Sequence, residues 1–327
     1  MHFLYITNYK TNIFMKKISF AFIFLLCFII ISCGGNKKKD KDDGNTLRSG
    51  YIKIAVDETM KDVLQNEINV YEGLYPAIIE PIYTTEPNAI DLLKKDTVRL
   101  AVTARPLNKS ELKYFHDKTY YPEEIRIAID AVAIITHPNN PDSIINVQNL
   151  KRILTGEIKS WNEIYPSSKL GKIQVVFDNT NSSIVRYAAD SICRDKPLSS
   201  ELNALDLNKE VVDYVAKTPN AMGLIGVSLI SNELDSVAVD FTKKIQVMRV
   251  SKEEKPDRYN SVQPYQYYIY TQEYPLTRNI YIILNDFRGE LPKGFTTFVA
   301  GDKGQRIIKS AGLLPVTMPV NQVVVYR

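Results

Sequence analysis

Residues 125–136 read IRIAIDAVAIIT, and this nearly unbroken apolar run decides the fold class. A strand that is apolar on both faces must be covered on both sides, which is typical of sheets flanked by helices. Further strands are expected at 52–56, 78–83, 98–102, 173–177 and 222–227, with amphipathic helices between them. The sequence therefore predicts an α/β protein with a largely parallel sheet.

The rest of the chain contains no internal repeat and no Pro- or Ser-rich linker after residue 50. Two more strands are expected at 265–270 and 279–284, followed by helices near 295–299 and 304–311. Two compact lobes joined by uninterrupted strands fit this pattern better than two separate domains on a flexible linker.

Composition excludes several classes of protein. The 327 residues are 45% hydrophobic and 24% charged, which is typical of a globular chain. Only three His and three Cys are present, so His/Cys metal clusters, cofactors held by them and disulfide frameworks are not expected. The formal charge of +4 falls to +1 without the leader lysines Lys10, Lys16 and Lys17, so no nucleic-acid partner is expected.

The N-terminal residues predict export. Residues 20–31 read FAFIFLLCFIII after Met15-Lys16-Lys17, and twelve apolar residues are too few to span a bilayer, which takes about 20. The run ends in Ile30-Ile31-Ser32-Cys33-Gly34, which resembles a bacterial lipobox. We expect a signal peptide at 1–32, with Met15 as the alternative start, a lipidated Cys33 and a polar tether at 33–50. A Cys33 buried in a core element is the alternative, but the charged residues directly behind it argue against burial.

This leader predicts a location on the extracytoplasmic side of a bacterial cell envelope, in the periplasm or at the outer membrane. The protein would be attached to the membrane through Cys33.

Hydroxyl side chains follow three strands at the points where helices are expected to begin. Helix N-termini offer N–H groups and a positive dipole end, and ligands of open α/β sheets bind beyond the carboxyl ends of strands. These junctions therefore predict an oxyanion site formed by Thr59, Thr103, Arg105, Asp178, Asn181, Ser182 and Ser183. The alternative is ordinary helix capping by the hydroxyls and a surface or hinge ion pair for Arg105. Asp130 is either a hinge residue, which we favour, or an acceptor for a protonated ligand.

Six segments, in chain order, resemble the substrate-binding component of phosphate ABC transporters in its lipoprotein form. They are LAVTARPL (100–107), AIDAVAIITHPNNP (128–141), LKRILTGEIKSWNEI (150–164), AMGLIGV (221–227), YPLTRNIYIILN (274–285) and GFTTFVAGDKGQRIIKSAGLLP (294–315). The resemblance implies a two-lobed, type II-like periplasmic-binding-protein fold with mixed sheets and two hinge crossings. It implies lobe I at 51–132 plus 265–327 and lobe II at 133–264.

By the same resemblance we expect a receptor, not an enzyme, that captures phosphate or a related oxyanion in the cleft for an ABC permease. We expect the protein to be a monomer. Four positions depart from the family's pattern. Asp57 and Glu58 replace small residues, Ala104 replaces an acid and Asp178 lies about where an arginine is usual. Carboxylates in a partly desolvated cleft repel a dianion.

Two other functions remain open. The first is a diverged binding protein for another solute or a ligand sensor, which the carboxylates at the junctions would suit. The second is an envelope hydrolase, the least favoured, because His116 and His137 lie in loop-like segments and no Gly-x-Ser-x-Gly motif is present.

Overall fold

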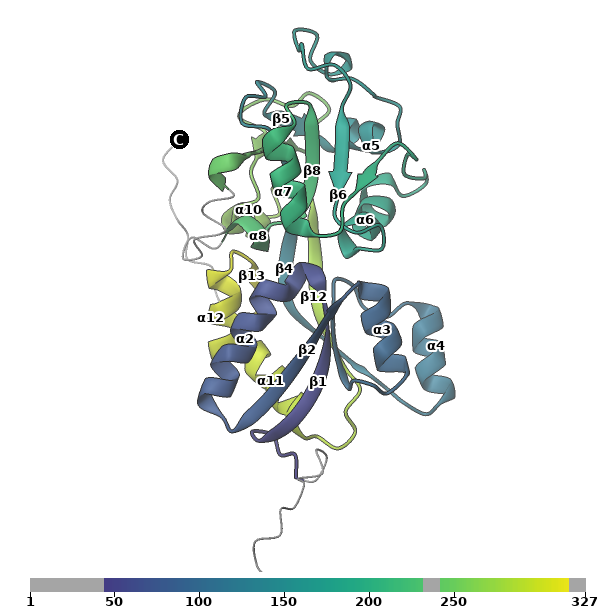
Figure 1. The fold of residues 1–327 in the computed structure, drawn as a ribbon, viewed down its shortest axis with the longest axis vertical. Helices are drawn as coiled ribbons and strands as arrows, with labels where there is room; N and C mark the ends of the chain where they lie inside the picture. The colour runs from purple at the N-terminus through teal and green to yellow at the C-terminus, as the bar shows by residue number, and fades with distance from the viewer. Residues whose placement is uncertain (1–43, 232–241, 318–327) are drawn as a thin grey trace, which may run out of the picture. The chain divides into compact units, whose positions relative to one another are not determined.

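Two sheets that share one long strand organise the chain in a computed structural model, which describes residues 44–231 and 242–317 (Figure 1). All of these residues belong to one unit that begins at Gly44. The predicted signal peptide, Cys33 and most of the predicted tether lie outside the described residues.

Lobe I is the part built on the sheet β2-β1-β3-β12-β4. Strands β1, β2 and β3 are parallel, and β12 lies antiparallel between β3 and β4. Its strands are β1 (Gly50–Asp57), β2 (Ala77–Thr84), β3 (Leu100–Thr103), β4 (Glu123–Thr136), β12 (Thr277–Leu284) and the short β13 (Leu314–Pro315). Its helices are the 3-10 turn η1 (Glu58–Met60), α2 (Lys61–Leu74), α3 (Glu86–Lys94), α4 (Lys109–Asp117), α11 (Leu291–Ala300) and α12 (Asp302–Ser310).

Lobe II is built on the second half of β4, followed by β8, β6 and β7, and β9 also pairs with β4. These strands are β6 (Gln174–Phe177), β7 (Asn203–Ala204), β8 (Ala221–Gly226) and β9 (Gln246–Val247), and a separate sheet holds β5 (Ile144–Asn146), β10 (Arg249–Ser251) and β11 (Ser261–Val262). The helices are α5 (Val147–Leu154), η2 (Trp161–Glu163), α6 (Ser183–Tyr187) with its π-helical continuation η3 (Ala188–Cys193), α7 (Asn208–Lys217) and α8 (Ser228–Ser231). Helix α10 (Gln266–Tyr270) follows β11 along the chain.

Strand β4 passes from one lobe to the other without a break. It pairs with β12 up to Ala131 and with β8 from Val132 onward. The chain returns to lobe I just before β12, where the N–H of Val132 donates to the carbonyl of Leu276 and the Tyr274 hydroxyl donates to the carbonyl of Val132. The predicted two-lobed α/β fold with mixed sheets is thus confirmed. The expectation of a largely parallel sheet is wrong, because β12 and β4 run antiparallel to their neighbours. The predicted lobe boundaries at 132/133 and 264/265 stay predictions.

The strand expected at 265–270 is wrong, because these residues form helix α10. The alternating aromatic residues of YQYYIY favour a strand by local propensity alone. In the fold, the side-chain amide of Gln266 donates to the carbonyls of Lys309 and Leu313, both at 2.7 Å. These contacts connect α10 to the end of α12, so tertiary packing overrides the local pattern.

The core runs through both lobes along β4. A single cluster of buried apolar side chains includes Ile54 and Val102 of lobe I and Ile134, Val176 and Ile225 of lobe II. No helix among residues 44–231 and 242–317 combines the length and apolarity that a membrane crossing requires. The buried cluster keeps the strand ends, and therefore the side chains that follow them, in fixed positions.

Candidate functional site

Arg278 is the centre of the contacts between the two lobes. It lies on β12 directly opposite Asp130 of β4, and its side chain is 2% exposed. Its Nε is 2.9 Å and its Nη2 2.8 Å from Oδ2 of Asp130. Burial raises the pKa of Asp130, and the Arg278 guanidinium opposes this rise by stabilising the carboxylate. Asp130 thus fixes the Arg278 guanidinium at the point where β4 changes lobes.

Two of the predicted ligand residues meet at this guanidinium from opposite lobes. Nη2 of Arg278 donates to Oγ1 of Thr59 at 3.0 Å, and Nη1 donates to Oγ of Ser183 at 2.7 Å. Thr59 lies in η1 after β1 of lobe I, and Ser183 begins α6 of lobe II. Their hydroxyl oxygens are 3.3 Å apart. The structure thus brings Thr59 and Ser183 together, although their role in binding stays a prediction.

Asp57 orients Thr59. Its Oδ1 accepts the Thr59 backbone N–H at 2.9 Å and the Thr59 hydroxyl at 2.6 Å. Asp57 is 1% exposed, and its Oδ2 has no hydrogen-bond partner among the described residues. The carboxylate at this junction therefore positions the hydroxyl that faces the other lobe.

The other predicted hydroxyls are hydrogen-bonded locally. Thr103 donates to the carbonyl of Arg105 at 2.7 Å, and Ser182 donates to Oδ1 of Asp178 at 2.5 Å while it caps α6. Asn181 is exposed. Burial raises the pKa of Asp178 to about 7, and the Ser182 hydrogen bond only partly offsets this rise. Among residues 44–231 and 242–317, neither Thr103 nor Ser182 makes a side-chain hydrogen bond to the opposite lobe.

The predicted ligand residue Arg105 is engaged in ion pairs within lobe I. Its Nη1 and Nη2 bind Glu111 at 2.7 and 2.9 Å, and its Nε is 3.0 Å from Glu86. Glu86 also accepts hydrogen bonds from Arg186 of lobe II, with the closest contact at 2.6 Å. An ion pair therefore spans the cleft beside Arg278.

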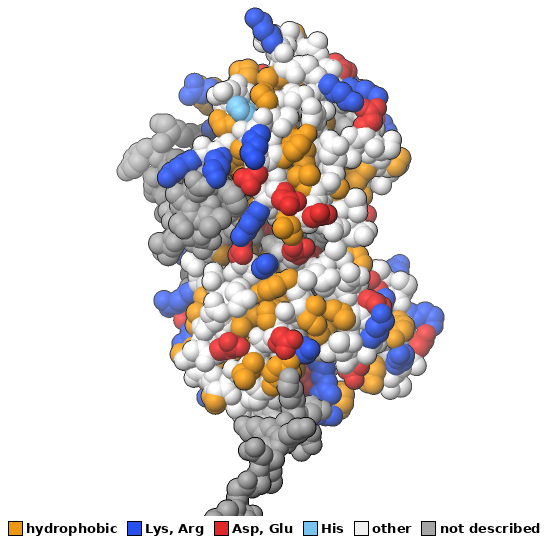
Figure 2. Space-filling view, in the orientation of Figure 1, with side chains coloured by type: hydrophobic (Ala, Val, Ile, Leu, Met, Phe, Trp, Pro, Cys, Tyr) orange, Lys and Arg blue, Asp and Glu red, His pale blue; other side chains and the backbone are white. Residues whose placement is uncertain are grey.

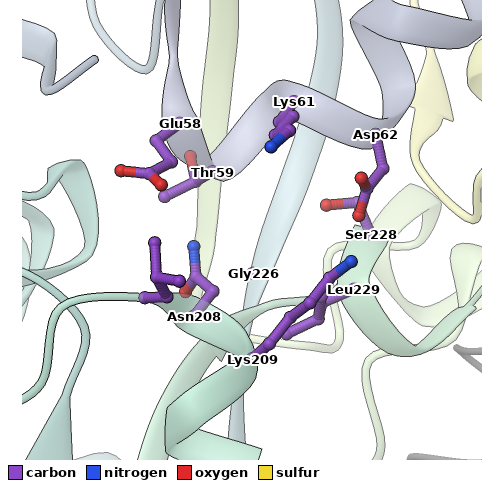
Figure 3. A pocket seen from close by; sticks show the side chains of 10 residues that line it. Glu58, Thr59, Lys61, Asp62, Asn208, Lys209, Gly226, Ser228 and Leu229 are labelled. Atoms are coloured by element: carbon purple, nitrogen blue, oxygen red, sulfur yellow. The ribbon is translucent and has the colours of Figure 1, made fainter. Parts of the chain in front are cut away.

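A pocket opens between the lobes next to Thr59. Lobe I lines it with Glu58, Thr59, Lys61 and Asp62, and lobe II lines it with Asn208, Lys209 and Ser228, among others (Figure 3). Its volume is about 100 Å³, room for about three water molecules. Figure 2 shows charged side chains of both signs gathered where the lobes meet. The pocket is suited to a small polar ligand.

No group of three or more His, Cys, Asp or Glu that could hold a metal ion occurs within the described residues. What the cleft offers is a set of hydroxyls, arginines and carboxylates. None of these arrangements places a nucleophile beside a histidine base. These groups can bind a ligand through hydrogen bonds and charge.

A family model described as the PBP superfamily domain matches residues 42–303. The chain belongs to the PBP superfamily. Among its relatives is a phosphate-binding protein PstS of Borreliella burgdorferi, 23% identical over 313 residues that cover 92% of this chain and 99% of that protein.

Two solved structures share the fold of this member of the PBP superfamily. One is a putative phosphate ABC transporter substrate-binding protein with bound phosphate from Clostridium perfringens, with a TM-score of 0.68 and 20% identity over 82% of this chain and 100% of that one. The other is an ABC-type phosphate transport receptor from Vibrio cholerae, with a TM-score of 0.63 and 21% identity over 82% and 100% of the two chains.

Sequence reasoning missed Glu86 and Arg278 at the centre of this PBP superfamily cleft. For Arg186 it weighed a position facing the cleft but favoured a solvated helix face, whereas the structure pairs Arg186 with Glu86. One signal was present for Arg278, because it is a lone cation in an apolar strand and Asp130 is a lone acid in another. Buried charges of opposite sign must be paired, so the two could have been matched. Glu86 carried no comparable signal, since an acid in the first turn of a helix is ordinary.

Proposed function

We propose that this chain is a lipid-anchored, extracytoplasmic receptor that captures phosphate or a related oxyanion between its lobes and delivers it to an ABC permease. The names of its relatives and its membership of the PBP superfamily support this proposal. The lipid anchor at Cys33 is proposed from the leader sequence. Binding and release would involve no covalent change, so the protein would not be an enzyme.

The observation that carries the proposal is the meeting of Thr59, Ser183 and Arg278. A hydroxyl from each lobe and a guanidinium from the hinge strand converge within 3.3 Å of one another. Hydroxyl and guanidinium donors are the groups that hold an oxyanion. In lobe II, Asp178 lies about where the resemblance places an arginine. Arg278 would supply the positive charge that this arginine would otherwise provide. Because the two hydroxyls are in contact, an anion would enter when the lobes move apart and would be enclosed when they close.

The proposal is tested by calorimetric titration of the purified full-length chain with phosphate, sulfate, molybdate and methylphosphonate. We expect phosphate to bind, and the double variant Thr59→Ala with Ser183→Ala to bind at least about a hundredfold more weakly, because two hydrogen bonds to a charged ligand are lost. The control is Ser261→Ala with Thr296→Ala, which removes one buried hydroxyl from each lobe outside the cleft.

Two results would contradict the proposal. If the double variant bound phosphate like the unmodified chain, the site would be misplaced. If only a different solute bound, the protein would be a diverged receptor. This outcome is tested because the carboxylates Asp57, Glu58 and Asp178 would repel a dianion.

A further inference from the structure

Glu86 lies at the start of α3 in lobe I, and its carboxylate is almost completely surrounded by protein. It is 1% exposed. Its Oε2 accepts the backbone N–H of Ala104 at 2.9 Å, just past the end of β3. Its Oε1 is 3.0 Å from Nε of Arg105 and 2.6 Å from Nε of Arg186.

The donors around this carboxylate come from both sides of the cleft. Ala104 and Arg105 belong to lobe I, whereas Arg186 lies on α6 of lobe II and also donates to the carbonyl of Ala104 at 3.1 Å. A backbone N–H beyond a strand end and arginines from two lobes are the donor types that an anion between lobes requires. In this structure the anion that they hold is a side chain of the protein itself.

We propose that Arg186 is a ligand-binding cation of lobe II and that Glu86 is an internal competitor which occupies it until the ligand arrives. This inference rests on the proposed function, because it assumes that the ligand is an oxyanion. Arg186 lies three residues after Ser183 on α6, so the two side chains point from the same face of the helix. An anion that contacts Ser183 is therefore within reach of Arg186.

Release of Arg186 from Glu86 leaves no buried charge without a partner. Glu86 keeps Arg105 and the N–H of Ala104, and Arg186 exchanges one carboxylate for the ligand's oxygens. Burial raises the pKa of Glu86, and the charges of Arg186 and Arg105 oppose this rise. The affinity of the cleft for its ligand would therefore depend on how readily Arg186 exchanges Glu86 for the ligand, and not on the formation of an additional charge pair.

The test compares Glu86→Gln with Glu111→Gln by calorimetric titration of phosphate into the full-length chain. Glutamine retains the acceptor for the Ala104 N–H but removes the charge that holds Arg186. We expect Glu86→Gln to bind phosphate about tenfold more tightly or better, since a charge-assisted hydrogen bond that competes with the ligand is weakened. Glu111→Gln removes the same charge from a neighbouring carboxylate that contacts Arg105 and not Arg186, and should leave the affinity within about twofold.

A second variant keeps the test decisive if Glu86→Gln does not fold. Arg186→Gln should weaken phosphate binding about tenfold or more, because it removes the proposed contact in lobe II. Small-angle scattering and the melting temperature check that both variants stay folded.

The outcomes separate this inference from the proposed function. If the unmodified chain binds phosphate and Glu86→Gln binds it equally or more weakly, Glu86 is not a competitor. If Arg186→Gln binds like the unmodified chain, Arg186 is not a ligand residue. If neither the unmodified chain nor any variant binds an oxyanion, the proposed function fails and this inference fails with it.

Discussion

The cleft contains two arginines that bridge the lobes in different ways. Arg278 is 2% exposed at its side chain and is bound to Asp130, whose side chain is 0% exposed. Arg186 is 25% exposed, and its partner Glu86 has a second arginine, Arg105. Arg278 cannot leave Asp130 without leaving a buried charge unpaired, whereas Arg186 can change partners. Arg278 is suited to providing a fixed guanidinium at the hinge, and Arg186 to exchanging one partner for another.

Removal of Asp130 tests whether this acid holds Arg278 in place. We expect Asp130→Ala to lower the free energy of unfolding by about 3–5 kcal/mol, because an uncompensated buried charge remains. Urea unfolding followed by circular dichroism measures it. The double variant Asp130→Leu with Arg278→Met should recover most of the loss, since a buried ion pair can be replaced by apolar side chains.

A matched control is Asp302→Ala, which breaks an exposed ion pair with Arg306 on α12 and should change stability by less than about 1 kcal/mol. A loss from Asp130→Ala as small as this control would show that Arg278 is not held by Asp130.

Asp178 is a third buried acid of this cleft, and it binds a hydroxyl instead of an arginine. Its pKa of about 7 in the fold is above its ordinary value of 3.8, so the folded state holds the proton more tightly than the unfolded chain. Its contribution to stability is therefore complete below about pH 4 and is lost as the pH rises to about 7. Asp178→Asn should remove this loss. Its stability at pH 8, relative to that at pH 4, should therefore exceed that of the unmodified chain by on the order of 4 kcal/mol.

The measurement is urea unfolding at pH 4, 6 and 8 for the unmodified chain and the variant. Asp213→Asn, at an exposed position of α7, serves as the control. Identical pH dependence of Asp178→Asn and the unmodified chain would mean that Asp178 is ionised throughout this range.

The smallest effect is expected for Arg186. Arg186→Gln should lower the free energy of unfolding by about 0.5–1 kcal/mol, because the pair is partly exposed and Glu86 keeps Arg105. Arg105→Gln should be more costly, since Arg105 also binds Glu111. Both are measured by urea unfolding. If Arg186→Gln destabilised the protein as strongly as Asp130→Ala, Arg186 would be a structural residue and the contrast between the two arginines would disappear.

The fold could be predicted from sequence because its strands are apolar and its helices amphipathic, as in 125–136. The candidate site could be predicted only in part. Thr59 and Ser183 were found because both follow strand ends, where topology alone brings side chains to the same edge. Arg278 lies within a strand, and its contacts depend on the register of β12 against β4, which no local pattern specifies. For the same reason, α10 was mistaken for a strand, since the carbonyls that hold Gln266 are more than forty residues away.

The continuity of β4 has a practical consequence for dissecting the molecule. One strand, β4, completes the sheets of both lobes. A cut between Ala131 and Val132 would divide this strand and leave backbone donors and acceptors at the cut unpaired. Neither fragment would be a finished unit, so split-reporter or domain-swap designs that work for chains with flexible linkers are unsuited here. Sensors made from this protein should instead carry their labels on the outer helices, for example α4 and α7, and leave the shared strand intact.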